Sequence, residues 1–155
     1  MALLYALTIT LHVLSAVLWV GGMFFAYVCL RPAAGGLEPP HRLALWRGVF
    51  DRFLPWVWAA VVVLMASGYF LVYELYDGFA IAGQPVMIMH ALAWVMTVLF
   101  WVLYFGPYRA LGRALDGGDI AAAAAALGGI RRIIAINLPL GLITVAIGSS
   151  GPFWR

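Results

Sequence analysis

The chain has 155 residues, of which 66% are hydrophobic and only 10% charged, and its mean hydropathy is +1.02. Soluble domains carry about 25% charged residues and about 45 to 50% apolar ones, so this composition excludes a water-soluble fold. The net charge of +3 comes from nine arginines, since the sequence contains no lysine. These arginines are scattered over loops and form no continuous basic face, which excludes a nucleic-acid-binding surface.

Four apolar segments are long enough to cross a lipid bilayer, which requires about 20 residues per helix. They cover about residues 2–30, 53–73, 85–105 and 133–148. The first segment should end at Arg31-Pro32, where a charge is followed by a helix breaker. We therefore predict one domain over residues 1–155, an all-α integral membrane protein folded as an up-down four-helix bundle.

Eight of the nine arginines lie in the two segments that join span one to span two and span three to span four. They are Arg31, Arg42, Arg47, Arg52, Arg109, Arg113, Arg131 and Arg132. The segment between spans two and three contains Glu74 and Asp77 but no basic residue. Because basic residues concentrate in cytoplasmic loops, both arginine-rich segments should be cytoplasmic and both termini outside.

Each arginine-rich segment should also contain a short helix at the cytoplasmic surface. Leu43, Trp46 and Phe50 recur at helical spacing before the second span, which predicts an amphipathic helix leading into it. In the other segment, Asp119 can cap a helix through the alanine run 121–126. The order of a histidine-bearing span, an arginine-rich segment and a histidine-free span occurs twice, so spans one and three are equivalent in a weak internal repeat.

Two histidines lie inside spans, His12 in the first and His90 in the third. An imidazole within a membrane requires a partner or a ligand, so each is a candidate functional residue. Both spans run from outside to inside, and the predicted depths of the two histidines match within the error of the span boundaries. A histidine that hydrogen-bonds across helices would explain either residue alone. His41, at the head of a surface helix, is expected to be solvated or to lie at the lipid headgroups.

Haem is one ligand that would explain the two histidines together. In an up-down bundle the first and third helices are diagonal, which suits an iron with two axial imidazoles. Trp19 shares a helical face with His12, and Trp94 shares one with His90, so the two indoles could line a porphyrin. We therefore predict haem b bound by His12 and His90, with Trp19 and Trp94 beside it.

Copper is the alternative ligand at the same position. Met87 supplies a soft thioether one turn before His90, and copper(I) accepts both thioether and imidazole ligands. Met89 points about 200° away from Met87 around the helix, so the two cannot face one undistorted site. Methionine in an apolar helix is also ordinary packing. A third hypothesis is that the protein is a non-catalytic accessory subunit in which both histidines are structural.

The segment from Leu11-His12 through Trp19-Val20-Gly21-Gly22-Met23-Phe24-Phe25, followed by Leu30-Arg31-Pro32, resembles the CopD-like family of bacterial inner-membrane proteins. The resemblance continues through Leu37-Glu38-Pro39-Pro40, Arg52-Phe53, His90 and the segment from Arg131-Arg132 to Asn137-Leu138. It implies copper uptake or resistance for CopD members, and haem binding with protoporphyrinogen oxidation for the related HemJ-type members. In either case His12 and His90 carry over as the ligands. HemJ-type proteins also use a lysine, and this sequence has none.

The leading functional hypothesis from the sequence is therefore a cytochrome-like protein of the inner membrane. It would hold haem b between His12 and His90 toward the outer face and exchange electrons with a quinone or a periplasmic redox partner. A membrane oxidoreductase activity and a homo-oligomer are both compatible with this hypothesis. The alternatives are a CopD-like copper-binding or copper-transport protein and a HemJ-like protoporphyrinogen oxidase.

Overall fold

The computed structural model describes residues 1–154, except for the side chain of Pro152, and consists of helices joined by short connections. The α-helices are α1 Ala2–Phe24, α2 Arg31–Ala33, α3 Pro39–Tyr76, α4 Gly83–Leu103, α5 Arg109–Asp116 and α6 Ile120–Ser150. Two π-helical turns, Phe25–Leu30 and Tyr104–Tyr108, follow α1 and α4, and Ala34–Gly36 and Gly151–Phe153 are 3₁₀-helical. No strand occurs over residues 1–154, which confirms the all-α prediction.

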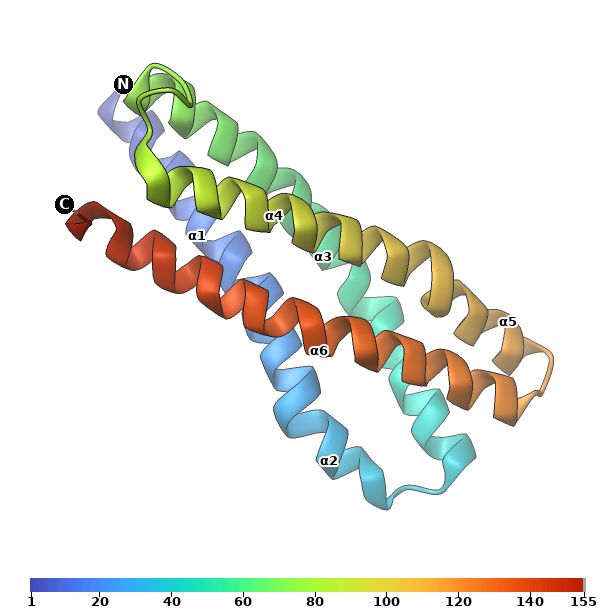
Figure 1. Cartoon of the computed structure of the whole chain (residues 1–155). Coiled ribbons are helices and arrows are strands. Elements are labelled where there is room, and N and C mark those ends of the chain that lie inside the picture. The colour runs from blue at the N-terminus through green and yellow to red at the C-terminus, as the bar shows by residue number, and fades with distance from the viewer. Residues whose placement is uncertain (155) are drawn as a thin grey trace.

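Four continuous helical rods result, Ala2–Gly36, Pro39–Tyr76, Gly83–Asp116 and Ile120–Ser150, each long and apolar enough to cross a membrane. Figure 1 shows them running up and down, with both chain termini and the α3–α4 connection at one end. The α2–α3 and α5–α6 connections lie at the other end. We call the first the histidine end and the second the arginine-rich end, because the eight arginines predicted to share a side lie toward it. The four-helix membrane bundle is therefore confirmed, whereas the side of the membrane that each end faces stays a prediction.

The first rod does not end at Arg31-Pro32, as its sequence suggested. The helix runs on through α2 to Ala33 and then through the 3₁₀ turn to Gly36. In the π-helical turn before Pro32, the backbone N–H of Arg31 donates to Ala26 O, five residues back. This shift of hydrogen-bond register directly before Pro32 accommodates a residue that has no N–H to donate.

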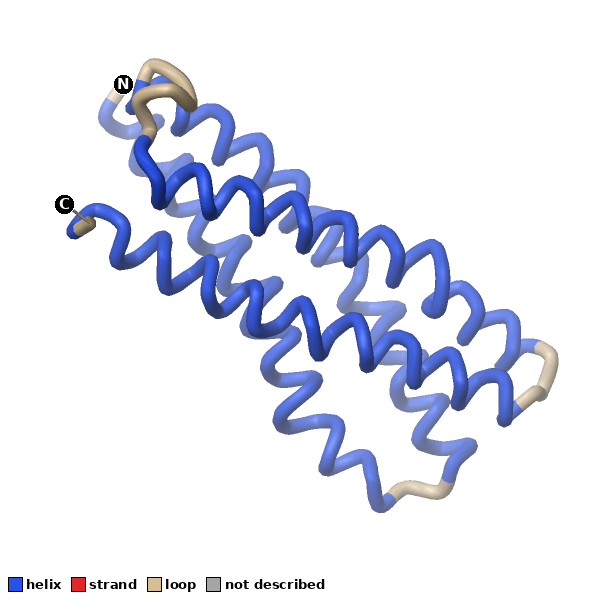
Figure 2. The backbone as a smooth tube through the Cα atoms, viewed as in Figure 1, coloured by secondary structure: helices blue, strands red, loops and turns tan. Residues whose placement is uncertain are grey.

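The predicted surface helices also differ in the structure, because they continue into the spans without a break. The residues from Pro39 onward belong to the same helix as the second span, and Pro55 lies inside it. Figure 2 shows non-helical segments mainly at the three connections and the chain ends. The cap at Asp119 is confirmed, since its Oδ1 accepts a hydrogen bond of 2.8 Å from the N–H of Ala122 at the start of α6.

The helices pack in two pairs, α1 with α3 and α4 with α6, and α6 also contacts α1 and α3. Two glycines permit close approach between helices. A Cβ on Gly22 of α1 would collide with the ring of Phe53 on α3, and a Cβ on Gly141 of α6 would lie 2.9 Å from Cγ2 of Val20 on α1. Buried side chains are concentrated from the middle of the bundle to the arginine-rich end. The first buried residue of α1 is Trp19, and the first of α4 is Met96. The last buried residue of α6 is Gly141.

Candidate functional site

His12 lies on α1 in the histidine half of the bundle and contacts α3. Its Nδ1 lies 2.8 Å from Oγ of Ser67, while the Ser67 hydroxyl donates to the backbone carbonyl of Val63. Since that hydroxyl proton is already used, Ser67 Oγ accepts a hydrogen bond from Nδ1–H of His12. The network therefore assigns the tautomer that leaves a lone pair on Nε2, the form in which an imidazole binds a metal.

Gly68 makes room for this imidazole. A Cβ at that position would lie 3.3 Å from Cε1 of His12. Gly21, by contrast, has no atom within 4 Å of its Cβ direction, so no neighbouring helix approaches closely at that position. Sequence reasoning missed Ser67, although a hydroxyl beside a glycine in an apolar span was the available signal.

His90 lies on α4 among aromatic rings. Its ring centroid is 5.3 Å from that of Tyr69 on α3 and 4.7 Å from that of Phe79 in the α3–α4 connection. The connection turns back over His90 because Asp77 and Gly78 adopt positive φ angles of 54° and 110°, which end α3. No hydrogen bond from the imidazole of His90 is found within residues 1–154, so both ring nitrogens are unused by these neighbours.

The two histidines lie at similar depths in the bundle. His12 contacts Ser67 and His90 contacts Tyr69, and two residues of an α-helix differ by about 3 Å along its axis. His12 reaches α3 from α1 and His90 reaches it from α4, so the two imidazoles approach that helix from different neighbours. His12 stands 13 residues before the first π-helical turn and His90 stands 14 before the second, in keeping with the weak internal repeat.

Of the two tryptophans predicted to line a porphyrin, one lies in the core and the other on the outside of the bundle. Trp19 is buried and packs edge-on against Phe100 of α4, at a ring-centroid distance of 6.2 Å. Trp94 is 39% exposed, and its indole N–H donates to the hydroxyl of Tyr69 at 3.3 Å. Met87 is also exposed, and the buried face of α4 is instead formed by Met96, Thr97, Phe100 and Leu103. Trp94 and Met87 therefore lie on a different face of α4 from its core residues.

Over residues 1–154, no group of three or more His, Cys, Asp or Glu side chains could hold a metal ion. Cys29 is exposed and lies in the π-helical turn toward the arginine-rich end, and His41 is exposed at the start of α3. The residues at the histidine end that could bind a metal in smaller sets are His12, His90 and the nearby methionines. Met89 does not share the position of Met87, because its Sδ would lie 3.0 Å from a Cβ on Gly148 of α6.

Asn137 is the buried polar residue of α6. Its Nδ2 donates to Met96 O of α4 at 3.4 Å, and its Oδ1 has no partner within the described residues. Asn137 thus joins α6 to α4 near the middle of the bundle.

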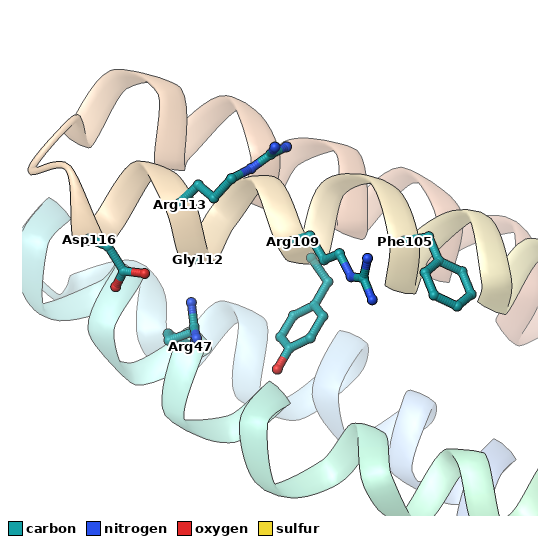
Figure 3. Close-up of a pocket in the computed structure, with 7 residues that line it drawn as sticks. Arg47, Phe105, Arg109, Gly112, Arg113 and Asp116 are labelled. Carbon is teal, nitrogen blue, oxygen red and sulfur yellow. The ribbon is translucent and has the colours of Figure 1, made fainter.

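A cavity of about 510 Å³ opens between α3 and α5 at the arginine-rich end (Figure 3). It is lined by Arg47, Phe105, Tyr108, Arg109, Gly112, Arg113 and Asp116. Nε of Arg47 lies 2.7 Å from Oδ1 of Asp51, and the Tyr108 hydroxyl donates to the same oxygen at 2.7 Å. Burial and this hydrogen bond raise the pKa of Tyr108, beyond the apolar span, to about 12. The phenol therefore stays protonated and joins the end of span three to α3.

The charges of this cavity are partly balanced within it. Although burial opposes the shift, hydrogen bonds from Tyr108 and Arg47 lower the pKa of Asp51 and keep it ionised. Asp116 points toward Arg47 in Figure 3 and lies on the lining. The guanidinium of Arg47 also occupies the space where a Cβ on Gly112 would stand. We interpret this network as a clamp between α3 and α5.

Comparison with known protein families identifies the chain. The family model described as copper resistance protein D matches residues 47–150, which include α4, α5, α6 and most of α3. The chain belongs to the CopD family. No curated protein and no solved structure matches the chain significantly. In this CopD family member the matched segment contains His90, Met87 and Asn137, whereas His12 lies before it.

Proposed function

We propose that this CopD family member handles copper within the membrane, with His12 and His90 as ligands and copper as its cargo. The observation that carries the proposal is the hydrogen bond from His12 to Ser67, because it fixes the tautomer and leaves Nε2 with a lone pair. The family match supplies the choice of metal, since it describes a copper-resistance protein. The imidazole nitrogens of His12 and His90 would bind copper, and no carboxylate ligand would be required.

The available donors suit copper(I) better than harder metals. Met87 precedes His90 by three residues, so the two side chains lie on one face of α4 and offer a thioether and an imidazole. Copper(I) accepts soft thioether ligands, whereas magnesium or calcium would require oxygens. The histidine half of α1 and α4 buries no side chain, which leaves His12 and His90 without a tightly packed core around them.

The positions of the arginines indicate the side of the membrane from which copper would enter. We infer from the positive-inside rule that the end toward which the eight arginines lie faces the cytoplasm. The histidine end then faces the periplasm of a bacterial inner membrane. We infer that copper enters the protein from this side.

Copper(I) titration of the purified full-length protein in detergent, against a colorimetric competitor, tests the proposal. The wild type should bind copper(I) stoichiometrically, and the variants His12→Ala and His90→Ala should each lose most of that affinity. Met87→Leu should weaken binding while keeping the side-chain volume. His41→Ala is the matched control, because His41 is exposed at the opposite end. Equal binding by all four variants and the wild type would overturn the proposal.

Haem b is a second candidate, and the similar depth of the two histidines is the observation that favours it. A haem held by both imidazoles would make the protein a cytochrome that exchanges electrons with a quinone or a periplasmic partner. An absorption spectrum after expression with ample haem separates the two candidates. A Soret band that His12→Ala and His90→Ala both abolish or convert would favour haem, and a colourless protein with stoichiometric copper would favour copper handling.

A further inference from the structure

Three arginines from different helices lie near enough at the arginine-rich end for the charges of two of them to act on the third. They are Arg31 of α2, Arg42 near the start of α3 and Arg131 of α6. Burial and, after it, the positive charges of Arg31 and Arg42 lower the pKa of Arg131. The ion pair found among residues 1–154 joins Arg47 to Asp51 and involves none of these three arginines. Glu38, the acid nearest to Arg42 in sequence, is exposed and forms no ion pair with any described residue. The three positive charges are therefore uncompensated.

Two buried donors at the same place lack acceptors. Nε of Arg131 and Nε1 of Trp46 are both buried without a hydrogen-bond partner among the described residues. The guanidinium carbon of Arg131 lies 5.9 Å from the centroid of the Trp46 ring, so the two groups adjoin. A buried donor left unpaired is costly. The contact of Arg131 on α6 with Trp46 on α3 thus holds two buried donors without acceptors, near the cations Arg31 and Arg42.

The cavity beside Arg47 shows the opposite arrangement at the same end. There Asp51 accepts hydrogen bonds from both the Tyr108 hydroxyl and the Nε of Arg47, and Asp116 lies on the lining. Among the buried side-chain donors of residues 1–154, those without an acceptor are Nε of Arg131 and Nε1 of Trp46. The lack of an acceptor is therefore a feature of this one contact.

We propose that the cluster of Arg31, Arg42 and Arg131 is a binding site for a phosphate group. Phosphate oxygens accept several hydrogen bonds at once, and the planar guanidinium group matches their geometry. The headgroup of an anionic phospholipid is the source nearest to a membrane surface, and basic pockets between membrane helices bind such headgroups. Free inorganic phosphate offers the same oxygens from solution. Trp46 forms the floor of the site beneath Arg131.

Thermal unfolding of the full-length protein in detergent, with and without added ligand, tests this site. The probes are short-chain phosphatidylglycerol, short-chain phosphatidylcholine and inorganic phosphate. Phosphatidylglycerol should raise the unfolding temperature in a saturable way and phosphatidylcholine should have less effect. A comparable, saturable shift with inorganic phosphate would identify free phosphate as the source and would still support the site.

The variants Arg131→Gln and Arg42→Gln should each weaken the apparent affinity for phosphatidylglycerol by about fivefold, the effect of one arginine near a phosphate surface. Arg132→Gln is the matched control, because Arg132 is the exposed neighbour of Arg131 on α6 and lies outside the cluster. Helical content by circular dichroism checks that each variant is folded, and Arg42→Gln serves if Arg131→Gln does not fold. Equal affinity in the wild type and both cluster variants, or an equal loss in Arg132→Gln, would overturn the proposal.

Discussion

The two ends of the bundle are built differently. At the arginine-rich end, Leu43, Leu111 and Ile130 from three different helices are almost completely buried. At the histidine end, residues 2–18 of α1 and 83–95 of α4 bury no side chain. Buried side chains hold helices together in a membrane by packing, because lipid tails solvate apolar surface as well as a protein core does. Packing therefore stabilises the bundle mainly at the arginine-rich end, whereas the buried residues of the histidine half are few and include Ser67 and Val72 of α3.

Removing a buried side chain at the arginine-rich end should have the largest effect. Ile130→Ala should lower the free energy of unfolding by about 3 kcal/mol, mainly because of the cavity it leaves. Val13→Ala, a 52% exposed position in the histidine half, is the control and should change it by less than about 0.5 kcal/mol. Reversible unfolding in mixed detergent measures both. Similar losses at the two positions would remove the contrast between the ends.

A methyl group added to α1 tests the packing between α1 and α3. Gly22→Ala should cost about 2 kcal/mol, because its Cβ would collide with the Phe53 ring. Gly21→Ala, at the adjacent position, meets nothing within 4 Å and should be neutral or stabilising by up to about 1 kcal/mol through helix propensity. The same unfolding measurement distinguishes them. A tolerated Gly22→Ala would show that α1 and α3 separate easily at this level.

The hydrogen bond between Ser67 and His12 allows the role of the histidine end in copper binding to be tested. Ser67→Ala removes the acceptor that fixes the His12 tautomer and should weaken copper(I) binding by about tenfold, as loss of such supporting groups does. Thr97→Ala is the control, since the buried Thr97 hydroxyl donates to Ala93 O in its own helix and touches neither histidine. Competition titration gives both affinities. Unchanged affinity in Ser67→Ala would remove Ser67 from the copper site.

The smallest effect is expected at the clamp between α3 and α5. Asp51→Asn should lower stability by less than about 1 kcal/mol, because the side chains of Arg47 and Asp51 are partly exposed and screened. The folded-state pKa of Asp51 is lowered, so its contribution is present above the unfolded pKa of about 3.9 and is lost as the pH falls through the folded value. Unfolding of wild type and variant should therefore converge in acid. A constant difference down to the lowest pH would contradict this account.

Composition and arginine placement were sufficient to predict the four spans and the common end of the arginine-rich connections. They could not locate the inner face of each helix, because a lipid-exposed helix is apolar on all sides and its periodicity carries little information. Trp94 and Met87 illustrate this, since both were expected to line a ligand together with His90, whereas both are exposed and lie away from the buried face of α4. Pro32 was read as a helix end because the compensating π-helical turn depends on backbone register, which sequence does not display.

The candidate site was only partly predictable for the same reason. His12 and His90 stood out because imidazoles are rare in membrane spans. Their partners Ser67 and Phe79 come from other segments, so only the packing of α1 against α3 and the turn after Tyr76 reveal them. The pairing of His12 with His90 on one ligand stays a prediction.

The most direct test of copper handling at the histidine end is the copper(I) stoichiometry of the purified protein, measured together with its absorption spectrum. The account predicts stoichiometric copper(I) in a protein without a Soret band, lost in His12→Ala and in His90→Ala but kept in His41→Ala. Copper that stays bound in both histidine variants, or a Soret band that disappears with either histidine, would contradict it.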